Sequence, residues 1–127
     1  MPIRIPITLT FLPTEDFLAD VLTTAMETPV GSHWITWTVQ QRDSEHRPIL
    51  AELEYENATD GHDTMQTTIT LDRIAEGIKA CIEKKLVNAD LTGYITAGVQ
   101  ENDASHIDAD AADVILQATV YGNVIFG

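Results

Sequence analysis

The stretch Ile49-Leu50-Ala51-Glu52-Leu53-Glu54-Tyr55-Glu56 decides the fold that we predict for this chain. From Ala51 onward, apolar or aromatic residues alternate with three glutamates, and successive side chains of a β-strand point to opposite faces of a sheet. One register therefore places an apolar face on a core and a row of carboxylates in water. This pattern is typical of an antiparallel sheet with one covered face and one solvated face.

Segments with the same two-residue period lie on both sides of this strand. The polar connection at 40–47 and the Asp60-Gly61 turn within 57–63 have the composition of hairpin loops. We therefore predict an antiparallel meander of three strands. The side chains expected on the core are Ile35, Trp37, Val39, Met65, Thr67, Ile69 and Leu71, and those expected in water are Trp34, Thr36, Thr38, Gln66, Thr68 and Thr70.

The N-terminal part predicts a further strand followed by a helix. Isoleucine, leucine or phenylalanine occupies every odd position from Ile3 to Phe11, and Pro6, which cannot donate to a β-ladder, places that strand at a sheet edge. Apolar residues then repeat at helical spacing over 15–27, with Glu15 and Asp16 at the positive end of the helix dipole.

Three more segments in the C-terminal half have helical spacing. They are 72–85, 89–99, and a last segment that begins near Asp108 or Asp110 and ends at Gly122. The order of strand, helix, three strands and helices predicts one α+β domain over residues 1–127. Its antiparallel sheet should have about four strands, with the C-terminal helices packed on one face.

The charge of the chain bears on its partners. Twenty acidic residues oppose seven basic ones in 127 residues, which gives a formal net charge of -13. Such a chain is repelled by nucleic acid and by anionic membrane surfaces, and it attracts cationic partners, although acidity also serves solubility alone. Cys81 is the single cysteine, and no apolar run is long enough to span a membrane, so we expect a cytoplasmic protein.

Negative charge is unevenly distributed along the sequence. Seven acids and one arginine lie between Asp43 and Asp63, six acids and no lysine or arginine follow Leu86, and the 72–85 segment is net positive. Carboxylates on one face of the glutamate strand recur about every 6.5–7 Å, close to the spacing of every second phosphate on a nucleic-acid strand. The residues predicted to bind a partner are Glu52, Glu54, Glu56, Trp34, Asp60, Asp63, Asp103, Asp108 and Asp110.

No arrangement of residues typical of catalysis or of a cofactor site occurs. The four histidines lie in separate loops or boundaries, Cys81 falls on a predicted core stripe, and no phosphate-binding glycine loop is present. The aspartates from Asp103 to Asp113 offer oxygen ligands for calcium or magnesium, but they lack the glycine and glutamate of an EF-hand loop. Helix capping explains them better, so we predict no cofactor and no metal.

The C-terminal end carries a resemblance. The sequences IDADAADVILQ at 107–117 and YGNVIFG at 121–127 resemble small acidic, functionally uncharacterised proteins of phages and mobile elements. In that genomic setting, small acidic proteins often inhibit host defence nucleases, sometimes as DNA mimics. The resemblance thus implies an anti-defence inhibitor, and it implies no particular binding residues.

Three hypotheses follow for the function. The first is a non-enzymatic acidic binding protein, a phage-type inhibitor that occupies a basic nucleic-acid-binding surface of a host defence protein by DNA mimicry, in the host cytoplasm. Its partner would be a basic surface of a nuclease or effector complex, with no direct contact to nucleic acid or membrane. The second is an enzyme or small-ligand protein with a site of unrecognised type. The third is a self-assembling or metal-stabilised accessory protein, for which a homodimer is one arrangement.

Overall fold

A three-stranded antiparallel sheet forms one layer of the protein. The computed structural model describes residues 11–27, 34–56 and 63–125. In these residues the sheet has the order β1 (Ile35–Arg42), β2 (Pro48–Glu56) and β3 (Thr64–Thr70), so the glutamate strand lies in the centre. The predicted meander of three strands is confirmed.

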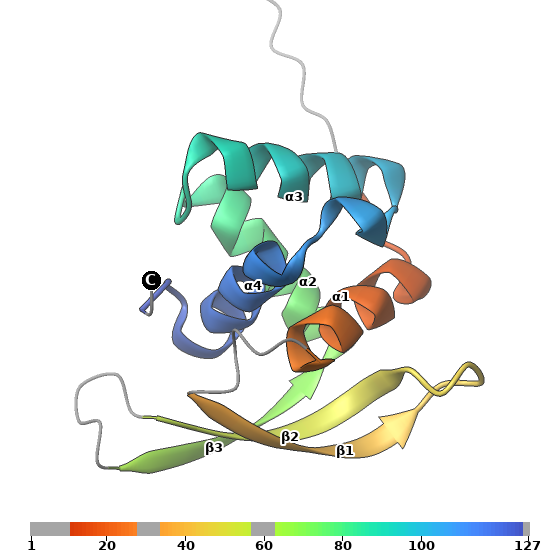
Figure 1. Cartoon of the computed structure of the whole chain (residues 1–127), viewed down its shortest axis with the longest axis vertical. Helices are drawn as coiled ribbons and strands as arrows, with labels where there is room; N and C mark the ends of the chain where they lie inside the picture. The colour runs from red at the N-terminus through yellow and green to blue at the C-terminus, as the bar shows by residue number, and fades with distance from the viewer. Residues whose placement is uncertain (1–10, 28–33, 57–62, 126–127) are drawn as a thin grey trace, which may run out of the picture.

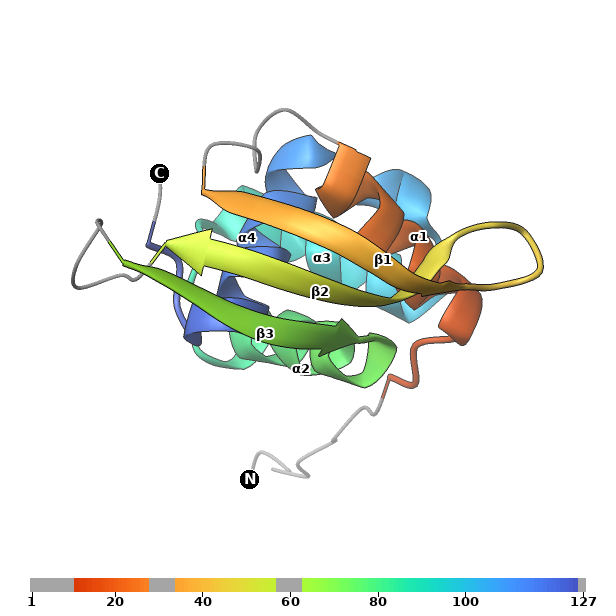
Figure 2. The same cartoon turned by 90° about the horizontal axis from the view of Figure 1, so that it is seen from below.

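Four α-helices of the described residues form the other layer. Figure 1 and Figure 2 show the helices gathered on one face of the sheet and the opposite face uncovered. The fold is therefore α+β with one covered sheet face, as predicted. The helices are α1 (Glu15–Glu27), α2 (Leu71–Glu83), α3 (Ala89–Glu101) and α4 (Ala109–Tyr121), and a short 3-10 helix, η2 (Ala104–His106), connects α3 to α4.

The predicted edge strand falls almost wholly outside the described residues. Of that segment only Phe11 is described, and it packs against the core. Thr14 N–H donates to Asn102 Oδ1 at 2.7 Å, and Asn102 Nδ2 donates to the Leu12 carbonyl at 3.4 Å. These bonds hold the start of α1 at the C-terminal end of α3, within the helical layer. We predicted a sheet of about four strands, and the described residues form three of them.

The change from strand to helix after β3 occurs without a loop. Thr70 ends β3 and is also the N-cap of α2, because its hydroxyl accepts a hydrogen bond from Arg73 N–H at 3.3 Å. Leu71 consequently begins the helix, although we expected it to end the strand. Arg73 also donates to the Thr68 and Thr119 carbonyls, so its charge is directed into the fold.

The core lies between the covered sheet face and the helices. Ala51 is opposite Val39 on one side and Ile69 on the other, and both Ala51 and Ile69 are fully buried. The helical side of the core includes Phe17, Val21, Leu22, Ile74, Ile78, Cys81, Ile95, Ile115 and Leu116. The alternation of β2 and the apolar stripes of the helices therefore meet as predicted.

Trp37 is less buried than we predicted. Its backbone has the parity of the core face and pairs with Leu53, yet 40% of the side chain is exposed. Trp37 lies on β1, an edge strand of the described sheet, whereas its partner Leu53 on the central strand is 1% exposed. Ile35 on the same strand is buried, so burial along this edge strand differs from residue to residue.

Gly77 permits close packing of α2 on α4. A Cβ added at this residue would lie 2.0 Å from Thr119 Oγ1 and 2.8 Å from the Ile115 carbonyl oxygen. Gly98 is similar, since its added Cβ would lie 3.0 Å from Ile107. In both places a helical glycine allows a neighbouring element to approach closely.

Candidate binding surface

The uncovered sheet face carries two exposed glutamates at its centre. In the strand register Glu54 lies between Thr36 and Gln66, and Glu52 lies between Thr38 and Thr68. All six side chains are exposed, and Figure 2 shows no helix in front of this face. We call the six residues, together with Gln40, the open face.

The carboxylates of the open face are not neutralised within the described part of the chain. Gln40 Nε2 donates to Glu52 Oε2 at 3.2 Å, and neither Glu52 nor Glu54 forms an ion pair with a described lysine or arginine. The other open-face residues are threonine or glutamine, so this surface combines two negative charges with uncharged hydrogen-bonding groups. It also has a shallow hollow of about 150 Å³ beside the glutamates.

The remaining acids predicted near the strand end have different surroundings. Glu56 is half-buried, and its backbone carbonyl accepts a 2.5 Å hydrogen bond from the Tyr121 hydroxyl. Burial raises the pKa of Tyr121 to about 12, so this hydroxyl keeps its proton as the donor. Asp63 is exposed just before β3, and Asp60 lies outside the described residues. The uncovered charge at the centre of the sheet thus comes from Glu52 and Glu54.

Trp34 is buried, which corrects the prediction that it faces a partner. The residue is 2% exposed, and its indole Nε1–H donates to Asp113 Oδ1 at 3.1 Å. Its ring also packs against Tyr121 with a centroid separation of 5.5 Å. Trp34 precedes β1, so the alternation of the strand does not fix its direction, and an indole N–H that finds a buried acceptor favours the interior.

The carboxylate that holds Trp34 belongs to a buried polar chain. Asp113 is 6% exposed, and its second oxygen accepts from Gln117 Nε2 at 2.7 Å. Gln117 Oε1 in turn accepts from Ile125 N–H at 2.8 Å, which ties the C-terminal segment to α4. Of the aspartates considered for a metal site, Asp113 is therefore an internal structural group.

The aspartates around η2 and α4 cap helices. Asp103 accepts from Ser105 N–H at 2.9 Å, and Asp108 accepts from Ala111 N–H at 2.8 Å. Hydrogen bonds from Ser105, and to a lesser extent the charge of His106, lower the pKa of Asp103. Asp110 is exposed in the first turn of α4. Asp103 caps η2, and Asp108 and Asp110 lie at the start of α4. These elements belong to the helical layer (Figure 1), so the structure does not bring the three predicted residues onto the open face.

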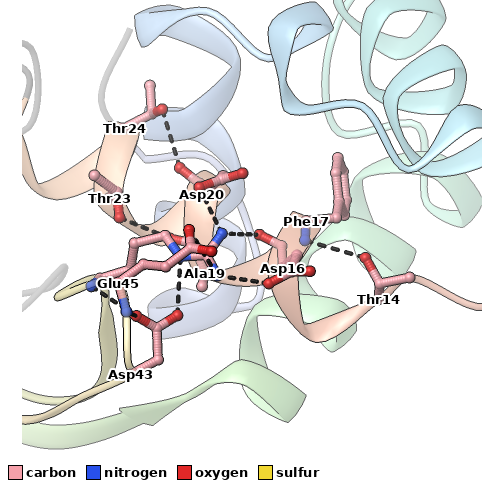
Figure 3. A network of polar contacts seen from close by, with 10 residues as sticks. Thr14, Asp16, Phe17, Ala19, Asp20, Thr23, Thr24, Asp43 and Glu45 are labelled. Atoms are coloured by element: carbon pink, nitrogen blue, oxygen red, sulfur yellow. Dashed lines mark hydrogen bonds and ion pairs between the residues drawn. The ribbon is translucent and has the colours of Figure 1, made fainter.

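Sequence analysis did not predict a second acidic surface, which forms around Arg47. Arg47, after the β1–β2 turn, pairs with Asp16 at 2.5 Å, Asp20 at 3.1 Å and Asp43 at 2.8 Å, and Glu45 is 3.6 Å away. Figure 3 shows these four carboxylates converging from α1 and from the turn. The Arg47 side chain is 16% exposed, so its charge is largely enclosed by the acids that it joins.

Three of these carboxylates, those of Asp16, Asp43 and Glu45, border a hollow of about 410 Å³, which we call the acidic hollow. Three separate parts of the chain meet there, namely the start of α1, the β1–β2 turn and the start of α2. The sequence shows these acids as three local groups, and only the fold places them together. Its charged lining residues are Glu15, Asp16, Asp43, Glu45, Asp72 and Arg47.

The Arg47 cluster predicts a dependence of stability on pH. Hydrogen bonds from the Arg47 backbone and side chain hold the pKa of Asp43 below its ordinary value. A depressed carboxyl pKa adds stability above the unfolded-state pKa, and this stability is lost as the pH falls through the folded-state pKa. Asp43→Asn should therefore unfold at lower urea concentration than the wild type at pH 7, with a difference that shrinks in acid. A difference that stays constant down to acid pH would contradict this role.

The cysteine and the histidines of the described residues lie in the core or at the surface. Cys81 is fully buried on α2, and burial raises the pKa of its thiol to about 11, which disfavours the reactive thiolate. His46 is exposed, and His106 pairs with Glu101 at the surface. Within the ranges described, no group of three or more histidine, cysteine, aspartate or glutamate side chains is arranged to hold a metal ion.

Comparisons with known proteins found no match among protein families, curated proteins or solved structures. In the described ranges of the chain, none of the helices combines the length and the apolar character needed to span a membrane. The geometry of the open face and of the acidic hollow is therefore the basis for a functional assignment.

Proposed function

We propose that this protein is a non-enzymatic acidic binding protein whose open face occupies a basic surface of a partner protein. One observation carries the proposal: all four described helices cover the same sheet face, which leaves Glu52 and Glu54 uncovered on the central strand without a described cation beside them. Desolvating two carboxylates against an uncharged surface is costly, whereas lysine or arginine side chains compensate them.

The spacing of the two carboxylates supports mimicry of a nucleic-acid backbone. Residues two apart on a strand are separated by about 6.5–7 Å, and phosphates of one strand advance about 3.4 Å per nucleotide. Glu52 and Glu54 can therefore stand for every second phosphate on a surface built to bind nucleic acid. The net charge of -13 adds long-range attraction toward such a surface.

The shape of the open face favours a macromolecular partner. Its hollow of about 150 Å³ is smaller than the roughly 300–1,000 Å³ typical of small-molecule pockets. The surrounding threonines and glutamines offer donors and acceptors on both strands that flank the glutamates. The acidic hollow, with five carboxylates against one arginine, is suited to a cationic side chain.

The resemblance of the C-terminal end to small acidic proteins of phages and mobile elements directs the choice of partner. It supports a host defence nuclease or an effector subunit whose nucleic-acid-binding surface is blocked in the host cytoplasm. This choice of partner rests on an analogy with small acidic proteins from the same genomic setting, whereas the acidic open face is an observed feature of this chain.

A capture experiment with competition by DNA tests the proposal. The tagged chain is incubated with nuclease-treated host lysate, and duplex DNA is then added in excess. We expect the captured partner to be a basic, nucleic-acid-binding protein that is released by DNA and by raised salt, because both compete for the same cationic site. A partner that stays bound under excess DNA would contradict mimicry.

A further inference from the structure

The outer edge of β1 lies beside the glutamates of the open face. Figure 2 shows β1 as one margin of the sheet, and its residues Thr36 and Thr38 pair with the two glutamates of the central strand. From Ile35 to Gln41 this strand has no charged residue and no proline, which are common means of protecting a sheet edge from pairing. The edge of β1 is therefore open to pairing with another strand.

The strand register shows which backbone groups of β1 point away from the sheet. Glu56 N–H donates to the Trp34 carbonyl at 3.2 Å, and hydrogen-bonded pairs alternate with non-bonded pairs along an antiparallel ladder. Because the pairing is regular from Ile35 to Val39, the N–H and C=O groups of Trp37 and Val39 point outward. Within the described residues, these outward groups make no hydrogen bond. We call the outward backbone of residues 35–39 the β1 edge.

The opposite margin of the sheet, on β3, is less suited to a further strand. By the same alternation the backbone of Thr68 points outward from β3, and its carbonyl already accepts a hydrogen bond from Arg73 Nη1 at 2.5 Å. Arg73 thus occupies an acceptor on that margin and places a positive charge beside it. An added strand, and a cationic one in particular, therefore finds a better site at the β1 edge.

The side chains on the two faces of β1 differ in character. Trp37, on the covered face of the sheet, is 40% exposed, and a strand added at the β1 edge would bury more of its indole. Tryptophan is enriched among the residues that contribute most to protein interfaces. On the open face, Thr36 and Thr38 are short and exposed. The β1 edge therefore favours an added strand with apolar residues on one face and long polar residues on the other.

Charge complementarity identifies the long polar residues as lysine or arginine. An added strand would lie two strand spacings, about 9–10 Å, from the central strand. Lysine and arginine side chains can extend over the short threonines of β1 toward Glu52 and Glu54, which form no ion pair with a described lysine or arginine. A strand without cationic residues would leave both carboxylates uncompensated at the interface.

We infer that the β1 edge accepts an extended segment of the partner protein as an added antiparallel strand, in which lysine or arginine alternates with apolar residues. Main-chain hydrogen bonds hold such a segment, and its alternate side chains provide the specificity. The apolar residues lie opposite Trp37 and Val39, and the cationic residues lie opposite Thr36 and Thr38. The inference rests on the proposed function, because it directs cationic side chains to the same open face, and it adds the mode of binding.

Titration of the full chain with a short, capped peptide of alternating lysine and valine tests this mode of binding. In the antiparallel register the valines lie opposite Trp37 and Val39, so the valine N–H groups bond to the β1 edge and the lysine N–H groups point away from it. We expect N-methylation of the central valines to weaken binding by roughly tenfold or more. N-methylation of the central lysines, which gives a peptide of the same charge and composition, should have little effect.

Hydrogen exchange of individual backbone amides locates the bound peptide. The N–H groups of Trp37 and Val39 should exchange more slowly when the unmethylated peptide is bound, whereas the outward N–H of Gln66 on β3 should be unchanged. Absence of binding, binding without slower exchange at these two residues, or an equal effect of the two N-methylations would overturn the inference. None of these results alters the release of the captured partner by DNA, so a failure here is distinguishable from a failure of the proposed function.

Discussion

Replacing Trp34 with alanine should lower the free energy of unfolding by about 3–5 kcal/mol. The side chain is 2% exposed, so its removal leaves a large cavity between the sheet and α4. The substitution also takes away the donor to Asp113, a buried carboxylate that would keep only its bond to Gln117. Because small domains are stable by about 5–15 kcal/mol in total, the loss should be large in a urea titration.

Trp37→Ala is the matched control for this substitution. Trp37 is 40% exposed on the edge of the sheet, so the same truncation should cost clearly less in the same titration. The sequence alone predicts the reverse order, with Trp37 inside and Trp34 outside. Equal costs, or a greater cost at Trp37, would contradict the burial of the two residues described above.

The order of strands and helices along the chain could be predicted, because the spacing of hydrophobic residues changes from one element to the next. The alternation around Ala51 and Leu53 indicated the central strand and its buried face, and both residues are buried. The stop of α4 at Gly122 was also predictable, since that residue adopts the left-handed conformation that glycine tolerates. Such signals lie within a few residues of the feature that they specify.

The features that sequence reasoning missed depend on contacts between distant residues. Trp34 is held by Asp113, 79 residues away, so no local pattern around Trp34 could show its direction. Arg47 likewise gathers carboxylates from α1 that lie 27 and 31 residues away. The predicted acids Asp103 and Asp108 have local hydrogen-bond partners instead, which is why they became caps and not part of the open face.

Reversing the two central charges of the open face should remove binding while preserving the fold. In Glu52→Lys/Glu54→Lys, each substitution adds two charge units, so the net charge changes from -13 to -9. Exposed substitutions usually change stability by about 0.5 kcal/mol or less, and Ala51, Leu53 and Tyr55 keep their parity. Lysines facing a basic site should cost about 3 kcal/mol, or roughly a hundredfold in Kd.

The control for this variant reverses two exposed glutamates of α2. Glu76→Lys/Glu83→Lys has the same net charge as the sheet variant, but its changes lie outside the open face. If overall acidity alone drives association, the two variants should lose equal affinity for the partner. If the open face is the binding surface, the α2 variant should retain most of the wild-type affinity, with a modest loss from long-range attraction.

The most direct measurement is the Kd of the captured partner for the wild type and both variants at two salt concentrations. Between about 0.1 M and about 1 M salt the screening length falls from about 10 Å to about 3 Å. We predict wild-type binding that weakens with salt, near-wild-type binding by Glu76→Lys/Glu83→Lys, and roughly hundredfold weaker binding by Glu52→Lys/Glu54→Lys at low salt. A folded Glu52→Lys/Glu54→Lys variant with wild-type affinity would contradict the assignment of the open face as the binding surface.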